Sequence, residues 1–252
     1  MSQRADPLSV IVTGSSSGIG REVARVFLEA GHRVVLHGRN AVKLQNVRNE
    51  LAASAPDAAG RLASVRGDIG DAATGRELVA TAVDRFGSAD VLVNNAGTFV
   101  PKPFLDVTEQ ELDGYLQGNL KGTYLTTQAV VRQMRAAGGG SIVNIGTVLI
   151  DHAVGGLPAS APLVSKGGVH ALTKSLAAEL AADGIRVNLV APGVVRTPLH
   201  EAVEVDAFGE VALLNRVGEA REIAEAVHYL ATAEFTTGHI LNVDGGFVTG
   251  RA

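Results

Sequence analysis

The sequence contains no cysteine, which excludes disulfide bonds, thiolate catalysis and cysteine-bound metals. This absence is compatible with a reducing compartment, and we expect no metal site. The formal net charge of −4 gives no basic field that would favour nucleic acid or an anionic membrane as a partner. No apolar run approaches the roughly 20 residues that span a bilayer, and residues 1–9 lack the apolar centre of a signal peptide. We therefore expect a cytoplasmic protein.

The 252 residues are 46% apolar and 19% charged, which is typical of an ordered protein with room for one large α/β domain. Apolar runs alternate with segments of helical periodicity. Strands are expected at 8–12, 32–36, 62–65, 91–93, 141–145, 185–190 and 239–243, and the longer helices at 108–137, 161–182 and 219–231. Such alternation predicts parallel strands joined by right-handed helical crossovers. Ligands of such sheets bind beyond the carboxyl ends of the strands.

A glycine-rich turn, Thr13-Gly-Ser-Ser-Ser-Gly-Ile-Gly20, follows the first expected strand and opens a helix. Glycine lets the backbone turn tightly and approach a ligand closely, while the free N–H groups at a helix start attract anions. The turn is therefore a candidate pyrophosphate site. The alternative is a glycine-rich connector without chemical meaning, because a lone pattern of this kind is weak.

Four further motifs occur in order along the rest of the chain. They are Asn94-Asn-Ala-Gly97, Asn119 in Gly-Asn-Leu-Lys-Gly, Pro192-Gly-Val-Val-Arg-Thr197 and Asn242-Val-Asp-Gly-Gly246. With these five motifs the chain resembles the short-chain dehydrogenase/reductase superfamily over nearly its whole length. The resemblance implies a Rossmann-type, doubly wound, seven-stranded parallel sheet in a single domain, 1–252. It also implies a substrate lid at about 199–215, and a homo-oligomer, either dimer or tetramer.

The resemblance further implies a nicotinamide dinucleotide and the residues that hold it. The pyrophosphate and adenosine phosphates would contact Gly14, Ser16, Ser17, Gly18, Ile19 and Gly20. Asp68 and Ile69 would bind the adenine, and Asn95, Ala96 and Gly97 would line its ribose. After the sixth strand, Pro192, Gly193, Val195 and Thr197 would lie at the nicotinamide, with Val195 and Thr197 holding its carboxamide. The alternatives are a helix N-cap for Asp68 and a turn hydroxyl for Thr197.

The choice between NAD and NADP depends on the residues after the second strand. An NAD enzyme usually places a carboxylate there for the ribose hydroxyls, whereas this chain has Gly38 followed by Arg39. A guanidinium can bind a 2′-phosphate through two charge-assisted hydrogen bonds. We expect a preference for NADP(H), with NAD(H) as the weaker alternative. The competing interpretation of Arg39 is a solvated loop arginine.

The resemblance also implies a catalytic relay of an asparagine, a serine, a tyrosine and a lysine. Asn119 matches the asparagine and Lys166 matches the lysine, which also binds the nicotinamide ribose. Thr147 stands at the serine position and keeps a hydroxyl. Four residues before Lys166, where the tyrosine is expected, the chain has Pro162, which carries no proton donor. A positioned general acid typically contributes about 10²- to 10⁴-fold in rate.

The sequence leaves three possible donors for the proton that the missing tyrosine would supply. Ser160 could approach the site, although its other role is a helix cap. His152 titrates near neutrality, but it could be a solvated loop residue. A water molecule held by Thr147, Asn119 and Lys166 is the third. Two functions follow: an NADP(H)-dependent oxidoreductase for a small carbonyl or alcohol, or a catalytically impaired dinucleotide-binding protein that serves as sensor, partner subunit or scaffold.

Overall fold

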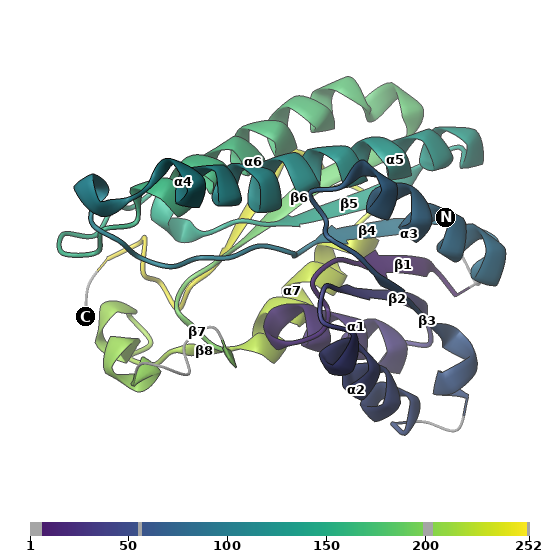
Figure 1. The fold of residues 1–252 in the computed structure, drawn as a ribbon, viewed down its shortest axis with the longest axis horizontal. Coiled ribbons are helices and arrows are strands. Elements are labelled where there is room, and N and C mark those ends of the chain that lie inside the picture. Colours follow the sequence, from purple (N-terminus) through teal and green to yellow (C-terminus); the bar gives the residue numbers. More distant parts are fainter. Residues whose placement is uncertain (1–6, 55–56, 199–203, 251–252) are drawn as a thin grey trace.

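The computed structural model describes residues 7–54, 57–198 and 204–250. Its centre is a seven-stranded parallel sheet in the order β3-β2-β1-β4-β5-β6-β9 (Figure 1). The strands are β1 (Ser9–Val12), β2 (Arg33–Gly38), β3 (Leu62–Arg66), β4 (Val91–Asn94), β5 (Gly140–Ile145), β6 (Ile185–Pro192) and β9 (Ile240–Val243). The order reverses between β1 and β4, which is the point where doubly wound sheets bind ligands. The expected fold class is confirmed.

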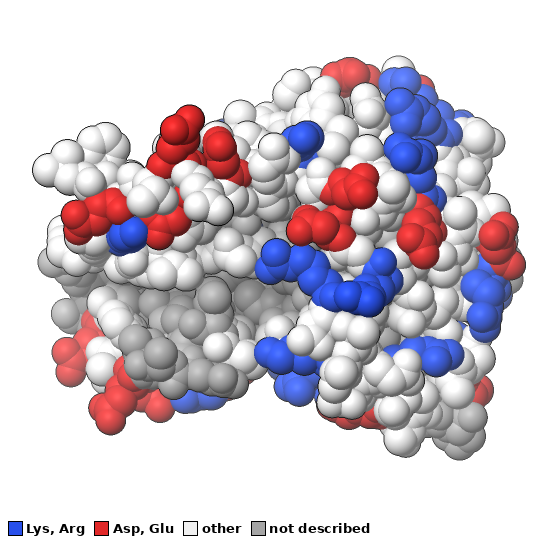
Figure 2. Space-filling view, viewed as in Figure 1, with Lys and Arg blue, Asp and Glu red and all other residues white. Residues whose placement is uncertain are grey.

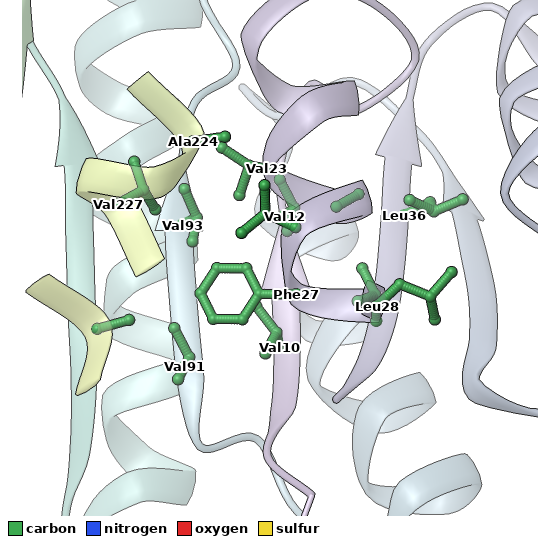
Figure 3. Close-up of a cluster of buried hydrophobic side chains, with 14 of the residues drawn as sticks. Val10, Val12, Val23, Phe27, Leu28, Leu36, Val91, Val93, Ala224 and Val227 are labelled. Carbon is green, nitrogen blue, oxygen red and sulfur yellow. The ribbon is translucent and has the colours of Figure 1, made fainter. Parts of the chain in front are cut away.

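Helices cover both faces of the sheet (Figure 1). One face carries α1 (Gly18–Glu29), α2 (Ala41–Ala52) and α7 (Ala220–Thr232), and the other carries α3 (Ala72–Phe86), α4 (Glu109–Tyr115), α5 (Gly122–Ala137) and α6 (Ser160–Glu179). Both faces of the central strands are therefore buried, which explains why their sequences are continuous apolar runs instead of alternating ones. In the first core, Phe27 of α1 lies among Val10, Val91 and Val227 (Figure 3).

The expected single helix over 108–137 is interrupted. Between α4 and α5 the chain makes a π-helical segment, Leu116–Lys121, which contains Asn119. The Thr123 hydroxyl donates to the Asn119 carbonyl oxygen at 2.8 Å. Segments of this type widen the helix locally and often occur at functional sites.

The segment expected as a lid is described from residue 204 onwards, and positions 199–203, including Val203, lie outside the described residues. A 3₁₀ helix, Val205–Val211, forms most of its described part. A two-stranded sheet of β7 (Val195–Arg196) and β8 (Gly218–Glu219) closes its base. Arg196 pairs with Glu219, which links the two flanks of the segment, and with Asp206 in its 3₁₀ helix.

Candidate dinucleotide and catalytic site

The glycine-rich turn lies between β1 and α1 and presents the start of the helix. Gly14 and Gly18 have φ angles of 65° and 54°, a region that favours glycine. The N-cap residue of α1 is Ser17, whose side chain makes no capping hydrogen bond, and the first turn holds no acidic residue. The first N–H groups of a helix have no intrahelical partner. This helix start is therefore suited to an anion.

Asn95 fixes this turn from the end of β4. Its side-chain Nδ2 donates to the carbonyl oxygens of Thr13 and Gly14 at 2.9 and 3.0 Å. The Thr13 hydroxyl in turn accepts from the backbone N–H groups of Asn95 and Ala96, each at 3.0 Å. A Cβ atom at Gly14 would lie 2.7 Å from the Ala96 Cα. The Asn95 amide thus binds the turn itself, and its place along a ribose stays a prediction.

His37, near the end of β2, is a site residue that sequence reasoning missed. Its Nδ1 accepts from the Gly14 N–H at 3.1 Å, and its Nε2 lies 3.2 Å from the Gly67 carbonyl oxygen. Burial lowers the pKa of His37, partly offset by the bond to Gly67 and the charge of Asp68. No motif contains His37, so its place in the continuous buried run of β2 is its only sequence signal.

Arg39 and Asp68 face each other across the ends of β2 and β3. The guanidinium lies 3.9 Å from the carboxylate, and the two side chains are 70% and 60% exposed. Asp68 accepts from the backbone N–H of Gly70 at 2.8 Å. Asp71, not Asp68, is the N-cap of α3, which removes the capping alternative for Asp68. In the view of Figure 2, lysine and arginine side chains gather beside a hollow near the centre of the molecule.

Ile69 follows β3 and Ile19 lies in the first turn of α1, both at the carboxyl edge of the sheet. Both side chains pack against the protein core. Ile69 is buried, and a Cβ atom at Gly122, where α5 begins, would lie 2.8 Å from its side chain. Ile19 is partly buried against the core beneath α1.

Lys166, Asn119 and Gly97 converge at the carboxyl edge of the sheet. A Cβ atom at Gly97 would lie 2.8 Å from the Asn119 Oδ1 and 3.6 Å from the Lys166 Nζ. Asn119 also binds the backbone of Thr98 through both atoms of its amide, at 2.8 and 2.9 Å. The Lys166 ammonium is buried, and burial lowers the pKa of this amine to about 8. Only a glycine at 97 allows this approach.

Thr147 follows β5 directly and begins a short 3₁₀ turn. Its hydroxyl oxygen accepts from the Leu149 N–H at 3.3 Å, which leaves the hydroxyl hydrogen available to another acceptor. Its own N–H points to the Nε2 of His170 at 3.4 Å. His170 lies one turn after Lys166 in α6, is buried, and has its pKa lowered by that burial.

Pro162 occupies the first turn of α6, a position that tolerates a residue without an N–H. It is buried, and its carbonyl oxygen accepts from the Ser165 hydroxyl at 2.8 Å. The helix begins at Ser160 after the N-cap residue Ala159, without a side-chain cap, so the capping role for Ser160 is wrong. His152 packs edge-on against Phe247, with ring centroids 5.2 Å apart.

A cavity of about 180 Å³ adjoins Pro162 between the starts of α4 and α6. Apolar walls and one ion pair line it: Val100, Lys102, Val107, Glu111, Tyr115, Ala161 and Pro162. The Tyr115 hydroxyl donates to the Val100 carbonyl oxygen at 3.0 Å. Tyr115 is therefore a wall of this cavity with its own hydrogen-bond partner.

The segment after β6 returns to the glycine-rich turn. A Cβ atom at Gly18 would lie 3.5 Å from the Thr197 Cβ, so the predicted phosphate and carboxamide residues are neighbours. Val195 is buried in β7. Gly193, after Pro192, packs against Asp244, whose Cα would lie 2.8 Å from a Cβ there. The structure thus brings residues from the carboxyl ends of β1 to β6 to one edge.

Among the described residues, no group of three histidine, aspartate or glutamate side chains could hold a metal ion. No described helix is long and apolar enough to cross a membrane.

Comparison with known proteins gives consistent matches over most of the chain. The family described as enoyl-(acyl carrier protein) reductase matches residues 14–248. The cis-4-hydroxycyclohexanecarboxylate dehydrogenase of Sinomonas cyclohexanicum is 38% identical over 94% of this chain and 95% of its own. The 3-oxoacyl-(acyl-carrier-protein) reductase FabG of Staphylococcus aureus is 36% identical over 94% and 97%. The structure of a short-chain type dehydrogenase/reductase from Mycobacterium marinum has a TM-score of 0.88, with 32% identity over 96% of each chain.

Proposed function

Because the chain belongs to the short-chain dehydrogenase/reductase family, whose members use NAD(P)(H), we propose that it is an NADP(H)-dependent oxidoreductase with an atypical proton donor. Its substrate is a small carbonyl compound or the corresponding alcohol. The observation that carries this proposal is the convergence of Lys166, Asn119 and Gly97 beside the glycine-rich turn. A buried ammonium without a carboxylate partner costs stability, which favours a functional role for Lys166.

The residues at the strand ends fit a dinucleotide. Gly14, Gly20 and Gly97 let the turn and the end of β4 pack closely, because a Cβ at each would collide with a neighbouring segment. The uncapped start of α1 offers N–H groups to the pyrophosphate. Arg39 is free enough to reach a 2′-phosphate, since its contact with Asp68 is long and exposed. These features support NADP(H) over NAD(H), because the position that would hold a carboxylate is Gly38.

A bound NADP(H) would supply hydride transfer to or from the substrate carbon. Lys166 would hold the ribose hydroxyls, while Val195 and Thr197 would orient the carboxamide. The Thr147 hydroxyl would donate to the substrate oxygen, because its oxygen already accepts from Leu149. With Pro162 at the position of the family's tyrosine, a water molecule near Thr147, Asn119 and Lys166 would deliver the proton. Ser160 and His152 remain the side-chain alternatives.

The segment 199–215 would close over the substrate. Its described part, with Val205 and Ala212 buried and Phe208 half-exposed, is apolar enough to cover a nonpolar substrate. The Arg196 ion pair with Glu219 would hold its flanks together, and the pair with Asp206 would hold its 3₁₀ helix. We expect the relatives' substrate types, 3-oxoacyl thioesters and hydroxylated alicyclic acids, to be the most informative compounds to test.

The second candidate function is a dinucleotide-binding protein without turnover. It is favoured by Pro162, which offers neither hydroxyl nor N–H, and by the buried state of that residue. One experiment distinguishes the two candidate functions. NADPH consumption is measured with a panel of 3-oxoacyl thioesters, cyclic ketones and aldehydes, alongside NADPH affinity by fluorescence titration. Turnover of any member supports the enzyme, whereas tight binding without turnover supports the sensor or scaffold.

A homo-oligomer is also part of the proposal. Tyr124 of α5 and Val164 of α6 are exposed apolar side chains, 51% and 59% accessible. Their helices lie on the same face of the sheet (Figure 1), so a second copy could cover both. Light scattering distinguishes a dimer or tetramer from a monomer.

A further inference from the structure

His37 binds two loops at once through its two ring nitrogens. Nδ1 accepts from the Gly14 N–H, which belongs to the glycine-rich turn, at 3.1 Å. Nε2 lies 3.2 Å from the carbonyl oxygen of Gly67, in the loop after β3. An imidazole that accepts at Nδ1 and donates at Nε2 is neutral and has its proton on Nε2. The two partners therefore fix both the tautomer and the ring orientation.

The backbone of His37 is attached to the same turn. Its N–H donates to the Ser15 hydroxyl oxygen at 2.9 Å, and its carbonyl oxygen accepts from the Ser15 N–H at 2.9 Å. The next residue, Gly38, leaves room for Ser16, because a Cβ there would lie 2.9 Å from that side chain. The end of β2 and the turn thus form one hydrogen-bonded unit.

This unit carries the groups that would recognise adenosine. Arg39 comes two residues after His37 and faces Asp68, which follows Gly67 directly. A change in the His37 ring would therefore move three loops relative to one another: the turn, the loop with Arg39 and the loop with Asp68. His37 as a residue is 2% exposed, so solvent cannot replace the two hydrogen bonds of its ring.

We propose that His37 is a positioning residue that sets the spacing between the phosphate-binding turn and the loops of Arg39 and Asp68, and thereby determines dinucleotide affinity. This inference rests on the proposed function, since it assigns a role within the same cofactor site. His37 touches neither substrate nor reacting atoms. Its replacement should raise the dissociation constant of the cofactor and change the rate at saturating cofactor much less.

The side chain can be dissected with three variants of the full chain. His37→Leu removes both hydrogen bonds at similar size, His37→Asn keeps an acceptor near the position of Nδ1, and His37→Gln keeps a donor near that of Nε2. NADPH and NADH dissociation constants are measured by fluorescence titration. For each lost hydrogen bond we expect a roughly 3- to 10-fold rise in the NADPH dissociation constant. The leucine variant should therefore show the largest rise, with partial recovery in the other two.

The matched control is His32→Leu, just before the opposite end of β2. Its Nδ1 accepts from the Leu8 N–H at 3.2 Å, so this variant also loses a histidine hydrogen bond but leaves the site intact. Unchanged NADPH affinity in a folded His37→Leu variant, or an equal loss in His32→Leu, overturns the inference. If His37→Leu does not fold, wild-type affinity in both His37→Asn and His37→Gln overturns it. A wild-type protein that binds neither cofactor refutes the proposed function itself.

Discussion

The Lys166 ammonium donates a 2.7 Å hydrogen bond to the carbonyl oxygen of Ile145 and so ties α6 to the carboxyl end of β5. The amine is buried, and desolvation of its charged form lowers its pKa to about 8. In the unfolded chain a lysine titrates near 10.4. The unfolded state therefore binds the proton more tightly, and the charge of Lys166 opposes folding at neutral pH.

Replacement of Lys166 should separate stability from function. Lys166→Met keeps the length of the side chain and removes the buried charge, so we expect the free energy of unfolding at pH 7 to rise by about 1–2 kcal/mol. Turnover should be lost, because the group proposed to hold the nicotinamide ribose is gone. Urea denaturation and NADPH consumption measure the two effects. Lys174→Met, on the exposed side of the same helix, should change neither.

Pro162 can be replaced by the residue that the family relay would place there. Pro162→Tyr should raise turnover by about 10²- to 10⁴-fold, the usual contribution of a positioned general acid. The cavity of about 180 Å³ beside Pro162 gives room for a ring. Pro162→Phe is the control, because it adds the same bulk without the hydroxyl. Equal rates in the two variants, with both folded by circular dichroism, would show that no proton donor is missing at 162.

The sheet and most of the site follow from local patterns in the sequence. Apolar runs bounded by glycine and polar residues place the strand ends, and parallel strands bring those ends to one edge. That is why Gly14, Asn95, Thr147 and Lys166 could be expected near one another from spacing and resemblance alone.

Side-chain direction could not be derived in the same way. The Asn95 amide turns towards the backbone of Thr13, a partner 82 residues away. His37 finds its partners in two different loops, and the π-helical segment around Asn119 interrupts a sequence with uniform helical periodicity. Each of these depends on contacts between segments far apart in the chain, which periodicity does not report.

Arg39 provides the test of cofactor preference. Arg39→Ala should weaken NADPH binding about 10- to 100-fold, because charge-assisted hydrogen bonds contribute roughly 1.5–3 kcal/mol. NADH binding should change little, since NADH has no 2′-phosphate. Isothermal titration calorimetry with both cofactors measures the ratio. Arg132→Ala, an exposed arginine of α5, is the control for a simple loss of charge. An equal loss for NADH and NADPH would contradict a phosphate-binding role.

Gly20 tests how tightly the turn must pack. A Cβ at this position would collide with the Asn95 Nδ2 and would lie 2.5 Å from the Gly14 carbonyl oxygen. Gly20→Ala should therefore displace Asn95 from the turn, lower the melting temperature and abolish dinucleotide binding. Gly60→Ala is the matched control, because nothing lies within 4 Å of a Cβ there. Retained NADPH affinity in Gly20→Ala would show that the phosphate site does not depend on this contact.

The lowered pKa values of four histidines predict how the free energy of unfolding depends on pH. Burial lowers the pKa values of His32, His37, His170 and His228 below the ordinary 6.5, and His32 and His228 stack with ring centroids 5.8 Å apart. The unfolded chain therefore binds more protons between the folded pKa values and 6.5. The histidine contribution to stability rises with pH across that window, so it should be complete above about pH 6.5 and be lost on acidification.

Urea denaturation between pH 5 and 8 measures this dependence. Protonation of His32 places a charge beside His228 and converts its Nδ1, the acceptor for the Leu8 N–H, into a donor. His228→Asn should therefore flatten the pH dependence, since it removes one lowered pKa and relieves the repulsion on His32. His239→Asn is the control, an exposed histidine just before the last strand. A slope unchanged by His228→Asn would assign the acid sensitivity to the histidines of the cofactor edge, His37 and His170.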